Sequence, residues 1–386
     1  MASPQHERPL PRSNRQLILA AQIAFLPTGI LTTLLGPMLP ILIARWSLTD
    51  TQAGTLFPVQ FLAALAGVQV SGILLARVGF RPVFLSGLLL MAGGVATLCL
   101  GSHGLGMVSV AVYGLGLGFI IPTDNLMIAE IAPGSRAAAV SFLNFYWGAG
   151  AVLCSLLVAW AQRHQLIPAF LGAVSVFLVL LAASVRNLPF PDAVKSTDSP
   201  MAWREICKHP TIWLFAAVFF LYPGAETAVG GWIGSYATRM GPRGEAMGPM
   251  MPAFFWLALM SGRASAGLLL RRVPERRVLQ AGFATAAVGI GLMLWSSTVP
   301  GVAASALVTG LSFATLYPIT IARLTHRFGV AARSIGSVMF SLASVGPAVL
   351  PWMVGVISRV TGNLRTGLTV PLAAAVILLL IHIKDW

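Results

Sequence analysis

The chain has 386 residues, of which 57% are hydrophobic and only 9% are charged. Soluble globular proteins carry about 25% charged residues, so this composition excludes the soluble classes and predicts a polytopic membrane protein. The net charge of +14 does not indicate a nucleic-acid partner, because the basic residues are dispersed among short segments between apolar runs.

Long apolar runs follow one another along the whole chain, and most are close to the roughly 20 residues that cross a bilayer as a helix. Continuous runs of this length favour helices over the short alternating strands of a membrane barrel. The predicted fold class is therefore all-α, with 12 transmembrane helices. We expect the spans at 17–44, 51–76, 83–101, 105–131, 137–162, 166–187, 211–238, 248–271, 277–296, 299–324, 333–360 and 364–384.

The positive-inside rule gives the orientation of these spans. With both termini in the cytoplasm, the inner segments hold 18 Lys and Arg residues, the outer loops hold six, and Arg263 lies within a span. This count predicts a multi-pass membrane protein with both termini cytoplasmic. We expect the membrane to be the cell inner (plasma) membrane.

One long polar stretch, residues 188–210, separates the spans into two sets of six. We interpret it as a cytoplasmic linker between an N-terminal bundle (1–187) and a C-terminal bundle (211–386). The two sets repeat at an offset of about 195 residues, because Gly67-x4-Gly72-x4-Arg77 recurs as Gly262-x4-Gly267-x4-Arg272. The bundles are therefore expected to be related by a pseudo-repeat.

The seventh span carries a carboxylate near its middle, Glu226, which follows Pro223-Gly224 and precedes Gly230-Gly231. A charged group at the bilayer centre costs about 3 kcal/mol or more, so it should face the protein interior or a water-filled cavity. The flanking Gly and Pro residues predict an interrupted helix at a midplane site. The alternative is a structural carboxylate paired with Arg263, whose side chain otherwise extends to the cytoplasmic face.

The segment after span two, Gly72-Ile-Leu-Leu-Ala-Arg77-Val-Gly79-Phe-Arg81, resembles the major facilitator signature Gly-x-x-x-Asp-Arg-x-Gly-Arg. Ala76 stands where that signature has its aspartate, so the usual charge latch between the halves is weakened or differently wired. Two parallel halves of six helices around a central cavity are the arrangement of this family.

Span four ends in Glu130-Ile-Ala-Pro133-Gly-Ser-Arg136, which is similar to the Glu-x-x-Pro-x-x-Arg element of sugar-porter-type members. We expect Glu130 to pair with Arg77, Arg81 or Arg136 near the inner surface, as a gate or a structural ion pair, and not to bind substrate. Arg263 is included with Glu130, Arg77 and Arg136 in the predicted gate.

Further segments resemble the fucose-permease and bacterial glucose-transporter branch, over essentially the whole chain. They are Gly36-Pro-Met-Leu-Pro40 with Trp46, Leu56-Phe-Pro-Val-Gln60, Asn144-Phe-Tyr-Trp147, Leu221-Tyr-Pro-Gly-Ala-Glu226 and Leu350-Pro-Trp352. This resemblance implies import of a hexose or a related polyol, driven by a proton or sodium gradient.

The carboxylates of the proton-coupled fucose permeases do not carry over. Span one has no Asp or Glu, and the matching position in span four is Ile121. Asp124 and Glu226 are therefore the candidates for binding Na⁺ or H⁺ as a coupling ion. Facilitated diffusion without coupling is the alternative.

A sugar site in an apolar cavity needs amide or carboxylate groups for the hydroxyls and aromatic faces for the C–H surfaces. The substrate-binding candidates are Gln60, Asn125, Asn144, Trp147, Glu226, Trp232, Trp256 and Trp352. Trp232 is also a candidate for the outer aromatic belt.

We expect no enzyme, no resident cofactor and no metal site, because the His residues lack ligand spacing and there is no Gly-x-x-x-x-Gly-Lys loop. The expected partners are a small-molecule substrate and membrane lipid, with no nucleic acid, and the protein is expected to be a monomer. The predicted function is secondary active transport of a hexose-like sugar or related small polar solute by alternating access. The alternatives are a major facilitator exporter of drug-like or hydrophobic compounds, and a membrane-embedded sensor or lipid-handling protein.

Overall fold

The computed structural model describes residues 12–98, 100–131, 136–191, 210–328 and 332–383. Across these ranges 12 helices are long and apolar enough to cross a membrane, which confirms the predicted number of spans. The secondary structure of the described residues is helical, without strands. The protein is therefore an all-α, multi-pass membrane protein.

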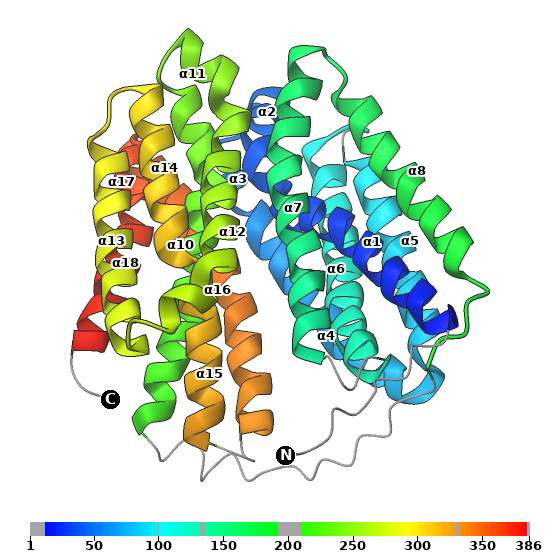
Figure 1. Cartoon of the computed structure of the whole chain (residues 1–386). Coiled ribbons are helices and arrows are strands. Elements are labelled where there is room, and N and C mark those ends of the chain that lie inside the picture. The colour runs from blue at the N-terminus through cyan, green and yellow to red at the C-terminus, as the bar shows by residue number, and fades with distance from the viewer. Residues whose placement is uncertain (1–11, 99, 132–135, 192–209, 329–331, 384–386) are drawn as a thin grey trace.

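Helices before residue 188 form a first helix group and those after residue 209 form a second helix group, and the two lie side by side in Figure 1. The first group consists of α1 (Arg12–Thr33), α2 (Leu35–Trp46), α3 (Asp50–Gly54), α4 (Leu56–Val78), α5 (Phe80–Thr97), α6 (His103–Ile131), α7 (Arg136–Arg163) and α8 (Ile167–Val185). The second group consists of α10 (Pro210–Thr238), α11 (Pro242–Met247), the short 3₁₀ turn η1 (Gly248–Met250), α12 (Met251–Leu270), α13 (Glu275–Trp295), α14 (Val299–Phe313), α15 (Leu316–Phe328), α16 (Ala332–Thr361), α17 (Leu364–Gly367) and α18 (Thr369–Ile383). Most of the expected linker, from residue 192 to 209, lies outside the described residues.

The two groups meet along several pairs of helices. Helix α2 packs against α10, α3 and α4 pack against α16, and α7 packs against α12. Helix α1 begins and α18 ends at the lower end of Figure 1, which we call the terminal end, whereas α2, α3 and α11 lie at the opposite, distal end.

Close helix crossings reveal the internal repeat in the first group. A Cβ atom on Gly29 of α1 would lie 2.0 Å from the carbonyl oxygen of Trp147 in α7. In the opposite direction, a Cβ atom on Gly150 of α7 would lie 2.1 Å from the carbonyl oxygen of Leu26. The two helices approach closely because neither position carries a side chain.

The second group repeats this crossing between α10 and α16. A Cβ atom on Gly224 would lie 2.9 Å from the carbonyl oxygen of Gly346, and one on Gly346 would lie 1.9 Å from that of Phe220. Gly224 and Gly346 follow Gly29 and Gly150 by 195 and 196 residues, the offset at which the sequence repeats. The same pair of small residues thus builds the same crossing twice.

The interruption that was expected in the seventh span is absent from the described chain. Helix α10 runs without a break from Pro210 to Thr238 and contains Pro223. Its glycines serve close packing instead, since Gly224 contacts α16 and Gly230 contacts the ring of Trp256. A proline is tolerated within a membrane helix when neighbouring groups satisfy the freed backbone.

Breaks occur in other spans. Leu34 separates α1 from α2, Thr55 separates α3 from α4, and residues 314–315 separate α14 from α15. The turn η1 lies between α11 and α12 in the eighth span. Leu34 and Thr55 keep right-handed helical backbone angles, so these two breaks are local interruptions of the helical hydrogen bonding.

Candidate functional site: the central cavity

A cavity of about 320 Å³ lies between the two helix groups. Its volume is at the lower end of the roughly 300–1,000 Å³ of typical small-molecule pockets. The first group contributes the lining residues Phe25, Thr32, Thr33, Leu35, Gly36, Phe57, Phe61, Ile121, Asn125, Asn144 and Trp147. The second group contributes Tyr222, Pro223, Glu226, Thr227, Gly230, Gly231, Trp256, Arg263, Tyr317, Ala343 and Pro347. The cavity therefore has a size that suits a small solute held by both groups.

Five of the predicted substrate-binding residues meet in this cavity: Asn125, Asn144, Trp147, Glu226 and Trp256. They come from α6, α7, α10 and α12, so the structure brings together side chains separated by more than a hundred residues along the chain. Each is a polar or aromatic residue within an apolar span, which is the feature from which the sequence predicts it as a binding residue.

The two amides are held by their own helices. Nδ2 of Asn125 donates to the carbonyl oxygen of Ile121 at 2.7 Å, and Nδ2 of Asn144 donates to that of Val140 at 2.8 Å. Each bond fixes the side chain against the preceding turn. Both amide groups are thus placed at the cavity wall in a defined orientation.

An aromatic pair joins the two helix groups across the cavity. The rings of Trp147 and Trp256 lie 5.8 Å apart at an interplanar angle of 87°, an edge-to-face arrangement. Nε1 of Trp147 donates to Oγ1 of Thr32 at 3.4 Å. Nε1 of Trp256 is buried and has no acceptor among the described residues. The pair supplies aromatic surface together with one unsatisfied donor.

Glu226 forms the polar centre on the side of the second group. Its Oε2 atom accepts a hydrogen bond from the Tyr222 hydroxyl and lies 3.7 Å from Nη2 of Arg263. The side chains of Arg263 and Glu226 are 31% and 12% exposed, and both line the cavity. Arg263 therefore pairs with Glu226 in the cavity, and the alternative in which it extends to the cytoplasmic face is not the arrangement found.

Tyrosines around this carboxylate were not among the predicted site residues. Tyr222 lies one helical turn before Glu226 on the same face of α10. Its ring stacks on that of Tyr317, with the ring centroids 6.2 Å apart. Residues four apart on a helix lie on the same face, so the spacing of Tyr222 and Glu226 is the sequence signal from which their contact could have been predicted. Both tyrosines line the cavity.

The other three predicted residues, Gln60, Trp232 and Trp352, are not in the cavity lining. Gln60 is buried, donates to the carbonyl oxygen of Thr32 at 2.9 Å and accepts from the Tyr113 hydroxyl at 2.8 Å. These bonds make Gln60 a cross-link between α1, α4 and α6.

Trp232 and Trp352 pack at the junction of the two groups. Trp232 is fully buried, and its Nε1 donates to the carbonyl oxygen of Pro351 at 2.9 Å. Its ring packs beside that of Phe57, with the ring centroids 6.4 Å apart. Trp352 is 39% exposed, and its backbone lies against Gly54 of α3. A tryptophan in an apolar run does not reveal whether its ring faces a cavity or a neighbouring helix.

Asp124 is not among the residues that line the cavity. It is fully buried, and neither carboxylate oxygen has a hydrogen-bond partner among the described residues. Its neighbour Asn125 is the residue that lines the cavity. An unpaired buried carboxylate is costly unless it is neutralised, so the structure leaves Asp124 as an isolated polar group within the first helix group.

At the terminal end, the side chains of Glu130, Arg77 and Arg81 are exposed. Within the described part of the chain, Glu130 forms no ion pair with Arg77 or Arg81. The side chain of Arg136 and the whole of Pro133 lie outside the described residues. The gate that we expected from these residues stays a prediction.

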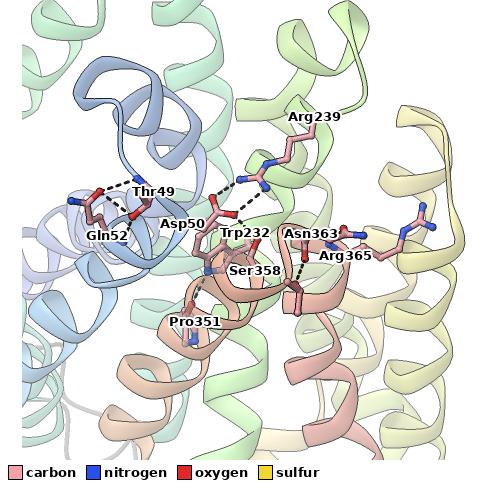
Figure 2. A network of polar contacts seen from close by, with 10 residues as sticks. Thr49, Asp50, Gln52, Trp232, Arg239, Pro351, Ser358, Asn363 and Arg365 are labelled. Carbon is pink, nitrogen blue, oxygen red and sulfur yellow. Dashed lines mark hydrogen bonds and ion pairs between the residues drawn. The ribbon is translucent and has the colours of Figure 1, made fainter.

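A polar latch at the distal end was missed in the sequence. Nη2 of Arg239 lies 2.5 Å from Oδ1 of Asp50, and Nη1 lies 3.1 Å from Oδ2. Ser358 of α16 donates to the same carboxylate, so three segments converge on Asp50 (Figure 2). The available signal was Thr49-x-x-Gln52, a capping box that begins α3 and places Asp50 at its first turn.

Glycines complete the closure beside this latch. A Cβ atom on Gly36 of α2 would lie 2.5 Å from the carbonyl oxygen of Gly230 in α10. One on Gly231 would lie 2.6 Å from the ring of Phe57. All four residues also line the cavity, so the tight contacts between α2, α4 and α10 form its distal wall.

Comparisons with known proteins agree with this arrangement. A family model described as Major Facilitator Superfamily matches residues 22–351. The bypass of stop codon protein 6 of Saccharomyces cerevisiae is 24% identical, over 89% of this chain and 77% of that protein. The glucose/mannose transporter of Bacillus subtilis is 22% identical, over 86% of this chain and 85% of that protein. A multidrug resistance protein of Aeromonas hydrophila is 27% identical, over 60% of this chain and 59% of that protein.

Solved structures share the fold at low sequence identity. A nucleoside transporter superposes with a TM-score of 0.79 at 14% identity, covering 95% of this chain and 99% of that one. A D-xylose–proton symporter superposes with a TM-score of 0.76 at 15% identity, covering 96% and 97% of the two chains. At this identity, the likeness establishes the fold.

Proposed function

The chain belongs to the Major Facilitator Superfamily, and we propose that it carries a hexose-like sugar or a related small polar solute across the cell inner membrane by alternating access. The family and its structural neighbours are membrane transporters and not enzymes.

The observation that carries the proposal is the composition of the cavity wall. Asn125, Asn144 and Glu226 supply groups that pair with hydroxyls, and Trp147 and Trp256 supply aromatic surface for the C–H face of a sugar. These five residues come from both helix groups, so a ligand bound among them would hold the two groups together. The named sugar transporters among the relatives and solved structures support the same class of solute.

Glu226 is the residue that we assign to coupling with H⁺ or Na⁺. It is the acidic residue of the cavity lining, and a cation arriving there would neutralise a costly group in the membrane interior. Asp124 is the second proposed ion site, reached only when the packing around α6 opens. From the distribution of basic residues we place the terminal end in the cytoplasm, and we treat the transporter as a monomer.

Binding and uptake together test this function. The purified protein is screened by thermal shift against hexoses, pentoses and polyols, with and without sodium. Proteoliposomes then measure uptake of each stabilising sugar under an imposed pH or sodium gradient. We expect at least one sugar to stabilise the protein and to accumulate. If no sugar stabilises it or enters the vesicles, the proposed function is wrong.

A matched pair of variants tests the role of Glu226. Glu226→Gln should abolish gradient-driven accumulation while leaving the protein folded. Glu245→Gln is the control, because Glu245 is exposed in α11 and away from the cavity. If Glu226→Gln keeps full accumulation, Glu226 is excluded from coupling, and sugar exchange without accumulation in the wild type would indicate facilitated diffusion.

Export of drug-like compounds is the second candidate. Three phenylalanines, Phe25, Phe57 and Phe61, line the cavity, and a multidrug resistance protein is among the relatives. Stabilisation by hydrophobic cations or dyes, without stabilisation by any sugar, would favour this function.

A further inference from the structure

Arg263 has more hydrogen-bonding capacity than its neighbours use. A guanidinium group carries five N–H donors, yet its contact with Glu226, at 3.7 Å, is longer than a hydrogen bond. Its Nε atom is buried and has no acceptor among the described residues. A cation in a membrane span is costly, and the polar neighbours of this one are Glu226 and Tyr222.

Glu226 does not satisfy Arg263, because the distance of 3.7 Å between Oε2 and Nη2 is too long for a hydrogen bond. Oε2 accepts from the Tyr222 hydroxyl and is also the oxygen nearest to Nη2 of Arg263. The bidentate arrangement in which a guanidinium and a carboxylate share two parallel hydrogen bonds is not formed. Arg263 thus keeps donors available on a side chain that is 31% exposed and lines the cavity.

A second unsatisfied donor lies on the same helix face. Trp256 and Arg263 are seven residues apart in α12, two helical turns, so both face the cavity about 10 Å apart along the axis. Nε1 of Trp256 has no acceptor among the described residues. The cavity wall formed by α12 therefore presents unused hydrogen-bond donors at Trp256 and Arg263. A ligand with several hydrogen-bond acceptors would complement this wall.

We propose that the transported solute carries a carboxylate, as a sugar acid or hydroxy acid does, and that Arg263 binds this acid group. This inference rests on the function proposed above and narrows its substrate class. The ring or hydroxyl-bearing part of the solute packs at Trp147 and Trp256, and the carboxylate displaces the loose contact between Arg263 and Glu226.

Charge balance links the acid to the coupling ion. Glu226 and Arg263 are the acidic and basic residues of the cavity lining, and together they carry no net charge. A carboxylate entering alone would leave one uncompensated negative charge in the membrane interior, which is costly. A cation at Glu226 removes this excess and releases Arg263 for the solute, so ion and acid favour each other's binding.

Matched pairs of neutral and acidic sugars test the inference. Glucose and glucuronate, and galactose and galacturonate, are titrated into the purified full-length protein by calorimetry, with thermal shift in parallel. We expect at least one acid to bind with a Kd roughly tenfold or more below that of its neutral partner. If a neutral sugar binds and its acid does not bind more tightly, this inference fails while the proposed function stands. If neither class binds, both fail.

Variants identify the residue responsible. Arg263→Gln should remove the preference for the acid, whereas Arg272→Gln, which removes an exposed charge just beyond the end of α12, should preserve it. Should Arg263→Gln fail to fold, Glu226→Gln gives an independent result, since removing the competing carboxylate should tighten acid binding. An acid preference that survives Arg263→Gln, or that weakens in Glu226→Gln, would overturn the role of Arg263.

Discussion

Arg239 and Asp50 form the ion pair that joins the two helix groups at the distal end, with Nη2 of Arg239 2.5 Å from Oδ1 of Asp50. Asp50 begins α3 in the first group, and Arg239 follows α10 in the second. Ser358 of α16 also donates to Asp50 (Figure 2). This pair lies beyond the distal wall of the cavity. The ion pair must therefore break before the cavity can open toward the distal end.

Neutralising Asp50 should weaken the distal closure. Partly exposed ion pairs contribute roughly 0.2–1 kcal/mol, so we expect Asp50→Asn to increase the population open at the distal end by a factor of roughly 1.4 to 5. Spin labels on Ala44→Cys and Ala246→Cys, exposed positions in α2 and α11, report this change as a longer component in the distance distribution.

Two further variants serve as controls for the latch. The charge reversal Asp50→Arg with Arg239→Asp should restore the shorter distances, because the pair is rebuilt with opposite polarity. Ser358→Ala, which keeps the ion pair, should have the smaller effect. Identical distance distributions in wild type and Asp50→Asn would show that the ion pair does not hold this end closed.

Close approach of Gly36 to Gly230 should contribute more to the closed state than the ion pair does. Gly36→Val places a side chain where even a Cβ atom would lie 2.5 Å from the Gly230 carbonyl oxygen. We expect this substitution to destabilise the closed state by roughly 1–3 kcal/mol. The unfolding temperature and the rate of uptake should both fall. Gly72→Ala is the control, since a Cβ atom there meets no atom within 4 Å. Equal effects of the two substitutions would argue against this role.

Gln60 should affect stability and not affinity. Gln60→Leu leaves the Thr32 carbonyl and the Tyr113 hydroxyl without their partner, at a cost of about 1–3 kcal/mol. Thermal unfolding should therefore shift downward while ligand affinity in the folded fraction is retained. Asn144→Ala should do the converse, with weaker binding and little change in unfolding temperature. A lowered affinity in Gln60→Leu at unchanged stability would return Gln60 to the binding site.

Asp124 should separate stability from function. Its carboxylate is fully buried without a hydrogen-bond partner among the described residues, so Asp124→Val removes a buried polar group that destabilises the fold. We expect a higher unfolding temperature together with reduced gradient-driven accumulation, measured on the same preparation. Accumulation at the wild-type level would remove Asp124 from the proposed ion sites.

The sequence by itself determined the class of the protein. Apolar runs of span length indicated the 12 helices, and the repeat at about 195 residues has a structural counterpart in the equivalent crossings at Gly29 and Gly224. The position of Glu226 at the cavity could also be predicted, because an acidic group in an apolar span is too costly to face lipid. Such inferences depend on solvation and on local spacing, both of which are properties of the chain before it folds.

Only the tertiary structure decided which side chains share the cavity. Trp232 and Trp256 both lie in apolar spans, yet Trp232 is hydrogen-bonded to the backbone of Pro351, whereas Trp256 lines the cavity. The unbroken course of α10 and the pair of Asp50 with Arg239, 189 residues apart, were equally hidden. The rotation of each helix about its axis is set by packing against its neighbours. Hydropathy does not encode this rotation, because a span that is apolar on all sides has no polar face to mark a direction.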